Sequence, residues 1–169
     1  FDKIAPAAAQ HHEYYALRGQ AHLLVHEPKA AIGVARAGLQ QFPTSLRLHF
    51  LLARAQEEDG DPDEAARTFR QVLALDPNLA PAYEGLGRIF ASQGDYAAAS
   101  LALQRCREIQ PDRLSAIRLL AQVREREGRV QDSLDLWREV ASLTQDPSER
   151  AEIERLVRRL QEASGVKSP

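Results

Sequence analysis

A 34-residue repeat is the feature that most constrains the fold of this 169-residue chain. Prolines recur at that interval, because 34 residues separate Pro43 from Pro77 and Pro77 from Pro111. Three columns of glycine or other small residues keep the same period. They are Gly60, Gly94 and Gly128; Gly19, Ala53, Gly87 and Ala121; and Ala31, Ala65, Ala99 and Ser133. Four columns in one register predict an array of similar units.

Each column has a physical role in a helical hairpin. Glycine commonly ends a helix because it adopts the left-handed conformation without strain, and proline just past a helix prevents its continuation. Small residues let two helix axes approach closely where they cross. We therefore expect first helices to end near Gly60, Gly94 and Gly128, and second helices to end before the three prolines. No strand-like alternation interrupts the pattern.

Two segments independently predict helix starts. Asp61-Pro62-Asp63-Glu64 combines an N-cap residue, a proline at the first helical position and a capping-box glutamate. Asp146-Pro147-Ser148-Glu149 repeats that order. Both starts agree with the register of the repeat.

The period and these columns resemble the tetratricopeptide repeat (TPR) family over residues 12–147. The third unit is closest to the family pattern, through Tyr83, Leu86, Gly87, Phe90, Gly94, Tyr96, Ala99 and Pro111. The resemblance implies an all-α, TPR-type α-solenoid of about four helix-turn-helix repeats plus a C-terminal capping helix. The predicted segments are a lead-in (1–11), units 12–45, 46–79, 80–113 and 114–147, a capping helix (148–163) and a tail (164–169). Unit one has Glu27-Pro28 in place of the turn glycine, and unit four has Gln145 in place of the closing proline.

The capping helix is predicted from its own apolar pattern. Ile153, Leu156, Val157 and Leu160 follow the i, i+3, i+4, i+7 spacing of one helix face, and charged residues occupy the other faces. Such a helix covers the apolar end of a repeat array and presents charge to water.

No pattern of residues in the sequence favours catalysis or metal binding over a structural role. His22 and His26 lie four apart on one predicted helix, the spacing of a two-histidine metal site, but packing slots explain them better. The acids Asp59, Asp61 and Asp63 lack the glycine and glutamate that a calcium loop requires. Cys106 occupies a helix-packing slot and is expected to be a buried, inert thiol. The sequence therefore predicts no enzyme, no cofactor and no metal site.

Composition bounds the class of partner. The 22 basic and 24 acidic residues give a formal charge of -2, so there is no basic excess that would favour nucleic acid. No apolar run reaches the roughly 18 residues of a membrane span. We expect a protein or peptide partner, no nucleic acid, no membrane insertion, and a soluble chain from either the cytoplasm or the periplasm. Because the chain begins at Phe1 and lacks methionine, it is interpreted as an excised or processed fragment.

The resemblance also implies a binding site, because first helices of the family line a concave groove that takes segments of partner proteins. The residues predicted to bind a partner there are Arg47, Phe50, Leu51, Arg54, Glu84, Arg88, Arg118 and Gln122. Arginines beside apolar side chains suit an acidic segment with an apolar anchor. The competing interpretation is that these arginines only pair with surface acids such as Glu57, Glu84 or Glu125.

Three functions follow. The favoured hypothesis is a non-enzymatic adaptor or scaffold that binds a partner segment in the groove. The alternatives are a homo-oligomerising structural scaffold, and an accessory domain of a multidomain enzyme or of a bacterial secretion or envelope component.

Overall fold

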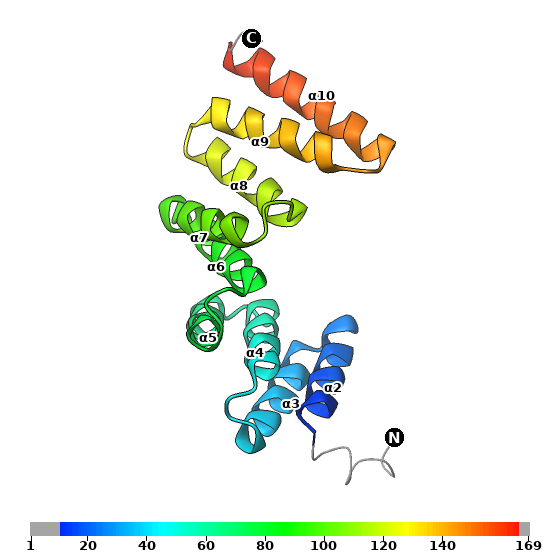
Figure 1. The fold of residues 1–169 in the computed structure, drawn as a ribbon, viewed down its shortest axis with the longest axis vertical. Helices are drawn as coiled ribbons and strands as arrows, with labels where there is room; N and C mark the ends of the chain where they lie inside the picture. The colour runs from blue at the N-terminus through cyan, green and yellow to red at the C-terminus, as the bar shows by residue number, and fades with distance from the viewer. Residues whose placement is uncertain (1–10, 166–169) are drawn as a thin grey trace. The chain divides into compact units, whose positions relative to one another are not determined.

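The computed structural model describes residues 11–165, and every regular element in that range is an α-helix (Figure 1). The predicted lead-in and tail lie largely outside the described residues. The helices are α2 (His12–Leu24), α3 (Pro28–Gln41), α4 (Leu46–Glu58), α5 (Pro62–Leu75), α6 (Ala80–Ser92), α7 (Tyr96–Ile109), α8 (Leu114–Arg126), α9 (Val130–Leu143) and α10 (Pro147–Ser164). None of these helices is long and apolar enough to cross a membrane.

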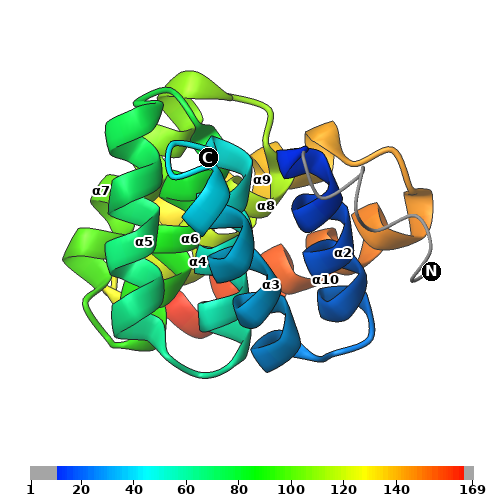
Figure 2. The ribbon, with the colours of Figure 1, turned by 90° about the horizontal axis from the view of Figure 1, so that it is seen from below.

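The described chain divides into two compact units, which are larger than the 34-residue repeats. We call them unit 1, which ends at Gly85, and unit 2, which begins at Leu86 within α6. In unit 1, α2 packs against α3, α3 against α4, and α4 against α5. Figures 1 and 2 both show α2, α3 and α4 of this unit side by side. In unit 2, α7 packs against α8, α8 against α9, and α9 against α10. Each unit is thus built from consecutive helices joined by short turns.

The predicted glycine turns are confirmed. Gly60, Gly94 and Gly128 follow α4, α6 and α8 with φ of 85°, 80° and 74°, a left-handed conformation that favours glycine. At the same position in the first repeat, His26 adopts φ of 57°. The expectation that His22 and His26 share one helix face was wrong, because α2 ends at Leu24 and His26 lies in the turn.

The helix caps agree with the sequence only in part. Asp61 Oδ1 accepts the backbone N–H of Glu64, as expected of an N-cap. The Glu64 carboxylate pairs with Arg67, and the Asp61 N–H bonds to the Gln56 carbonyl, so the reciprocal half of the capping box does not form. Asp146 caps α10 through the N–H of Ser148.

The small-residue columns lie in the core. Ala31, Ala65, Ala99 and Ser133 are fully buried. Gly87 faces Leu103 of the following helix so closely that a Cβ atom on the glycine would lie 2.6 Å from Leu103 Cγ. The prediction that this column marks close helix crossings is confirmed at Gly87.

The last helix, α10, is amphipathic as expected. It packs against α9 and buries Ile153 and Val157, while the charged residues between them are exposed. Gly165 ends the helix in the left-handed conformation, with φ of 65°.

Candidate functional site

Unit 2 contains a cavity of about 670 Å³ formed by α6, the start of α7 and α8. It contains two of the predicted groove residues, Arg88 and Gln122. Its other lining residues are Ala91, Ser92, Tyr96, Leu119, Val123, Glu125 and Arg126. The open volume is sufficient for several side chains of a bound segment.

The repeat places the polar groups of this cavity on one side of α8. Gln122 and Arg126 are four residues apart, so they lie one above the other on the helix surface, and both are exposed. Arg88 is exposed on α6. Within residues 11–165, neither the Gln122 amide nor the Arg126 guanidinium has a hydrogen-bond partner. Both groups are therefore available to a ligand.

The single carboxylate of the cavity is held in place. Glu125 Oε1 accepts the Trp137 indole N–H at 2.7 Å and the Ser133 hydroxyl at 3.1 Å. These donors anchor the carboxylate against α9 and partly satisfy its charge. Two arginines against one restrained carboxylate leave the cavity with a net positive charge.

The larger apolar side chains of the cavity are those of Tyr96, Leu119 and Val123. Val123 is buried, whereas Leu119 and Tyr96 are half-buried and keep part of their surface open to the cavity. An apolar surface beside unpaired donors can take a segment that carries both an apolar anchor and an acceptor group.

The other predicted residue of unit 2, Arg118, is already occupied. Its Nη2 donates to Glu149 Oε1 of α10 at 2.6 Å and to the Thr144 hydroxyl at 3.4 Å. It is half-buried and joins α8 to α10. Arg118 therefore pairs with an acid, as the competing interpretation of the groove arginines expects. Its partner is Glu149 rather than Glu57, Glu84 or Glu125.

The predicted residues of unit 1 divide into exposed and buried sets. Arg47 and Arg54 on α4 are exposed, and Phe50 is half-buried with its ring centroid 5.8 Å from that of Phe69. Leu51 is buried in direct contact with Gly19, and Glu84 is buried on α6. Leu51 and Glu84 therefore offer little surface to a ligand.

Tyr96, Glu125 and Arg126 also line the cavity, although none of them is among the groove residues predicted from the sequence. Arg126 could have been predicted from the sequence, because it lies one helical turn after the predicted groove residue Gln122 and on the same face of the helix. Tyr96 lies at the start of a second helix, α7, and the family resemblance predicts a groove lined by first helices only.

Metal and thiol chemistry gains no support in the described part of the chain. Residues 11–165 contain no group of three metal-ligating side chains. Imidazoles instead make local contacts: His22 Nδ1 lies 2.8 Å from Glu27 Oε2, and His49 Nε2 lies 2.8 Å from the Pro43 carbonyl. Cys106 is fully buried, as expected.

Helix-turn-helix units at a 34-residue period define a helical-repeat protein of the class that binds other proteins. The chain belongs to the tetratricopeptide repeat family, whose sequence model matches residues 23–89 and 57–123. It is 35% identical over 66 residues to Tetratricopeptide repeat protein 8 of Caenorhabditis elegans, a match that covers 39% of this chain. The chain spans only 13% of that relative.

Solved structures have the same fold. The crystal structure of MamA is similar with a TM-score of 0.75 and 19% identity, over 89% of this chain and 86% of that one. A structure of MamA from residue 41 to the end, from Desulfovibrio magneticus RS-1, gives a TM-score of 0.72 and 18% identity, over 90% and 96% of the two chains. The TPR-type fold predicted from the sequence is confirmed.

Proposed function

We propose that this chain acts as an adaptor or scaffold, without catalysis of its own, by binding an acidic or carboxylate-bearing protein segment. The site is the cavity that holds Arg88, Gln122 and Arg126. The observation that carries the proposal is the pair of open donors, Gln122 and Arg126, beside Arg88 and above a partly apolar floor.

Charge and shape support this class of ligand. A carboxylate accepts two parallel N–H bonds from one guanidinium, so arginine favours carboxylates over neutral acceptors. Leu119 and Tyr96 add apolar surface for a neighbouring side chain of the ligand. A segment with one apolar residue flanked by acids satisfies both parts.

The test is a titration with capped decapeptides that carry a central leucine flanked by four glutamates. Replacing Arg88 and Arg126 together by glutamine is expected to weaken binding by about 2 kcal/mol, roughly 30-fold, because charge-assisted hydrogen bonds are lost. Added salt is expected to weaken binding to the wild type as well.

A matched control removes the same charge elsewhere. Arg105 and Arg138 are exposed or partly exposed, and each pairs with an acid three residues away on its own helix. The Arg105→Gln, Arg138→Gln variant should bind the peptide like the wild type. Equal losses in the two double variants would indicate bulk charge attraction, and no loss in either would remove this cavity as the site.

A second candidate function, homo-oligomerisation, has one observation in its favour. Leu24 of α2 is 82% exposed, although the equivalent positions 34 residues apart are the polar Glu58, Ser92 and Arg126. Leu17 lies two helical turns earlier on the same face of α2 and is 59% exposed. Sedimentation of the wild type and of Leu24→Glu would test this: a concentration-dependent dimer that the variant abolishes supports self-association through α2.

A further inference from the structure

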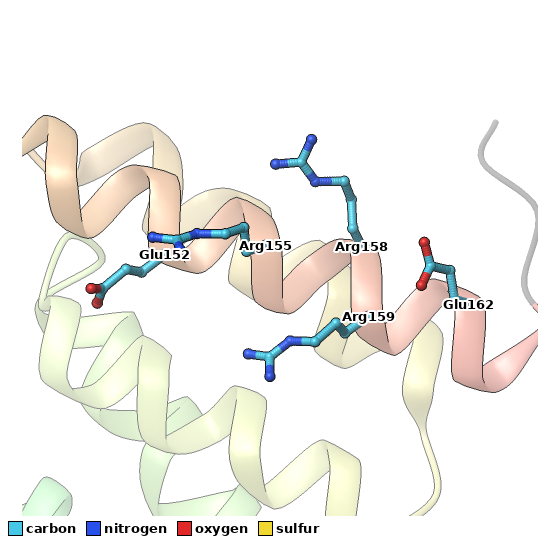
Figure 3. Close-up of a pocket in the computed structure, with 5 residues that line it drawn as sticks. All are labelled: Glu152, Arg155, Arg158, Arg159 and Glu162. Atoms are coloured by element: carbon cyan, nitrogen blue, oxygen red, sulfur yellow. The ribbon is translucent and has the colours of Figure 1, made fainter.

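The capping helix α10 carries a second cavity, of about 650 Å³, that shares no residue with the cavity of α6–α8. Glu152, Arg155, Arg158, Arg159 and Glu162 line it. In the view of Figure 3, the three guanidinium groups fan out around α10, with Arg155 between Arg158 and Arg159. Three arginines thus point from one short stretch of helix toward open space.

These arginines have no carboxylate partner in the described chain, unlike six other arginines of unit 2. Among residues 11–165, none of Arg155, Arg158 and Arg159 lies within ion-pair distance of a carboxylate, and Arg155 Nε only donates to the Ala151 carbonyl at 3.2 Å. Arginines of unit 2 that do pair with an acid are Arg105, Arg107, Arg118, Arg124, Arg129 and Arg138. The cavity on α10 therefore concentrates unpaired positive charge.

Glutamates limit what such a surface can accept. Glu152 and Glu162 lie at the two ends of the cavity, so a ligand of uniform negative charge, such as a phosphate backbone, would meet repulsion at both ends. A ligand with acidic groups in its centre and basic groups at its ends would be attracted throughout. The charge order of the cavity thus favours a mixed-charge segment.

The spacing of the charges sets the order of residues in that segment. At a rise of about 1.5 Å per residue, Arg155 and Arg159 lie about 6 Å apart along α10, and Glu152 and Glu162 about 15 Å apart. Side chains two apart in an extended segment share a face and lie roughly 6.6 Å apart. Two acids at positions 3 and 5 match the arginines, and basic residues at positions 1 and 7 reach the glutamates through their long side chains.

We infer that the face of α10 with Arg155, Arg158 and Arg159 docks an extended protein segment of the order basic-x-acidic-x-acidic-x-basic. The surface is separate from the proposed groove, and a single partner need not contact both. Intrahelical pairing with Glu152 or Glu162 competes little, because exposed ion pairs three residues apart on a helix contribute only slightly to stability.

The test compares two capped peptides of identical composition and zero net charge, KTETETK and the charge-reversed ETKTKTE. Each is titrated into the 169-residue chain, and the chemical shifts of backbone amides locate the site. We expect KTETETK to shift amides of α10 and to bind roughly tenfold more tightly than ETKTKTE, a ratio that corresponds to about 1.4 kcal/mol. Equal binding of the two peptides, or no binding, would overturn the inference.

Variants and a second ligand class complete the experiment. Arg155→Gln with Arg159→Gln should abolish the preference, whereas the control Arg105→Gln with Arg138→Gln should keep it, with circular dichroism reporting the fold of both. Shifts confined to α6 and α8 would refute the α10 surface and leave the proposed groove intact. Tighter binding of oligothymidylate than of KTETETK at α10 would refute a protein segment as the ligand.

Discussion

Replacing Gly87 by alanine tests whether the repeat brings α6 and α7 into contact at this residue. A Cβ atom on Gly87 would lie 2.6 Å from Leu103 Cγ, 2.8 Å from Cδ2 and 3.3 Å from Cδ1. Carbon atoms pack at roughly 3.5–4.0 Å, so the two helices or the Leu103 side chain must move by close to 1 Å. Leu103 is fully buried, so its side chain is enclosed by protein atoms.

Two opposing effects decide the magnitude. Overpacking a well-filled core by one methyl group costs about 1–3 kcal/mol. Alanine in a helix interior is favoured over glycine by roughly 0.5–1 kcal/mol. We therefore expect Gly87→Ala to lower the free energy of unfolding by about 1–2 kcal/mol.

Gly33→Ala is the matched control, because Gly33 lies inside α3 and a Cβ atom there meets nothing within 4 Å. Only the helix-propensity gain remains, so this variant should be more stable than the wild type by roughly 0.5–1 kcal/mol. Urea unfolding followed by circular dichroism at 222 nm measures both changes. A Gly87→Ala protein as stable as Gly33→Ala would refute the close crossing.

A double variant tests the same contact. In a Leu103→Ala background the leucine side chain no longer occupies the space beside residue 87, so Gly87→Ala should destabilise the protein much less. A full, additive loss of stability there would also contradict the contact.

Three further variants follow from particular contacts. Asp61→Ala removes the side-chain cap of α5 and should cost about 1 kcal/mol in urea unfolding, while Asp61→Asn should restore most of it. His26→Gly relieves a left-handed backbone and should raise the thermal midpoint by a few degrees, since the conformation costs a non-glycine residue roughly 1–2 kcal/mol; a lower midpoint would show that the His26 contact to Glu58 outweighs the strain. Deleting residues 148–169 exposes the face of α9 that Ile153 and Val157 cover, so the truncated chain should bind more of an apolar dye and aggregate; an equally stable monomer would argue against capping.

The repeat columns predicted the fold well because each depends on chemistry within a few residues. A glycine at the end of a helix needs only its own left-handed conformation, and Gly60 and Gly94 both adopt it. Pro77 follows the end of α5 by two residues, as the register required. In the first repeat His26 stands at the glycine position, and it adopts the same left-handed conformation with φ of 57°. The substitution is visible in the sequence, but a missing glycine does not predict whether the turn keeps its conformation.

Contacts between helices were harder to predict. Glu149 was expected to complete a capping box at the start of α10, yet its carboxylate pairs with Arg118 of α8. Leu51 was expected in the groove, yet it fills the space that Gly19 leaves open. Both outcomes depend on which residue lies opposite in space. The period gives the position of each side chain on its own helix and leaves its neighbour undetermined.

The pairing of arginines shows why candidate binding residues need the structure. On α7 and α9, Arg105 and Arg138 pair with acids three residues away, the arrangement that sequence spacing favours. Arg155 and Arg159 also have acids three residues away, Glu152 and Glu162, yet neither pair forms. An exposed pair of this kind is worth only about 0.3–0.5 kcal/mol, so small differences in side-chain packing decide whether it forms. A ligand carboxylate that meets two guanidinium groups gains more than one such pair supplies. For that reason our two proposed sites rest on the unpaired arginines of α8 and α10 rather than on arginine content itself.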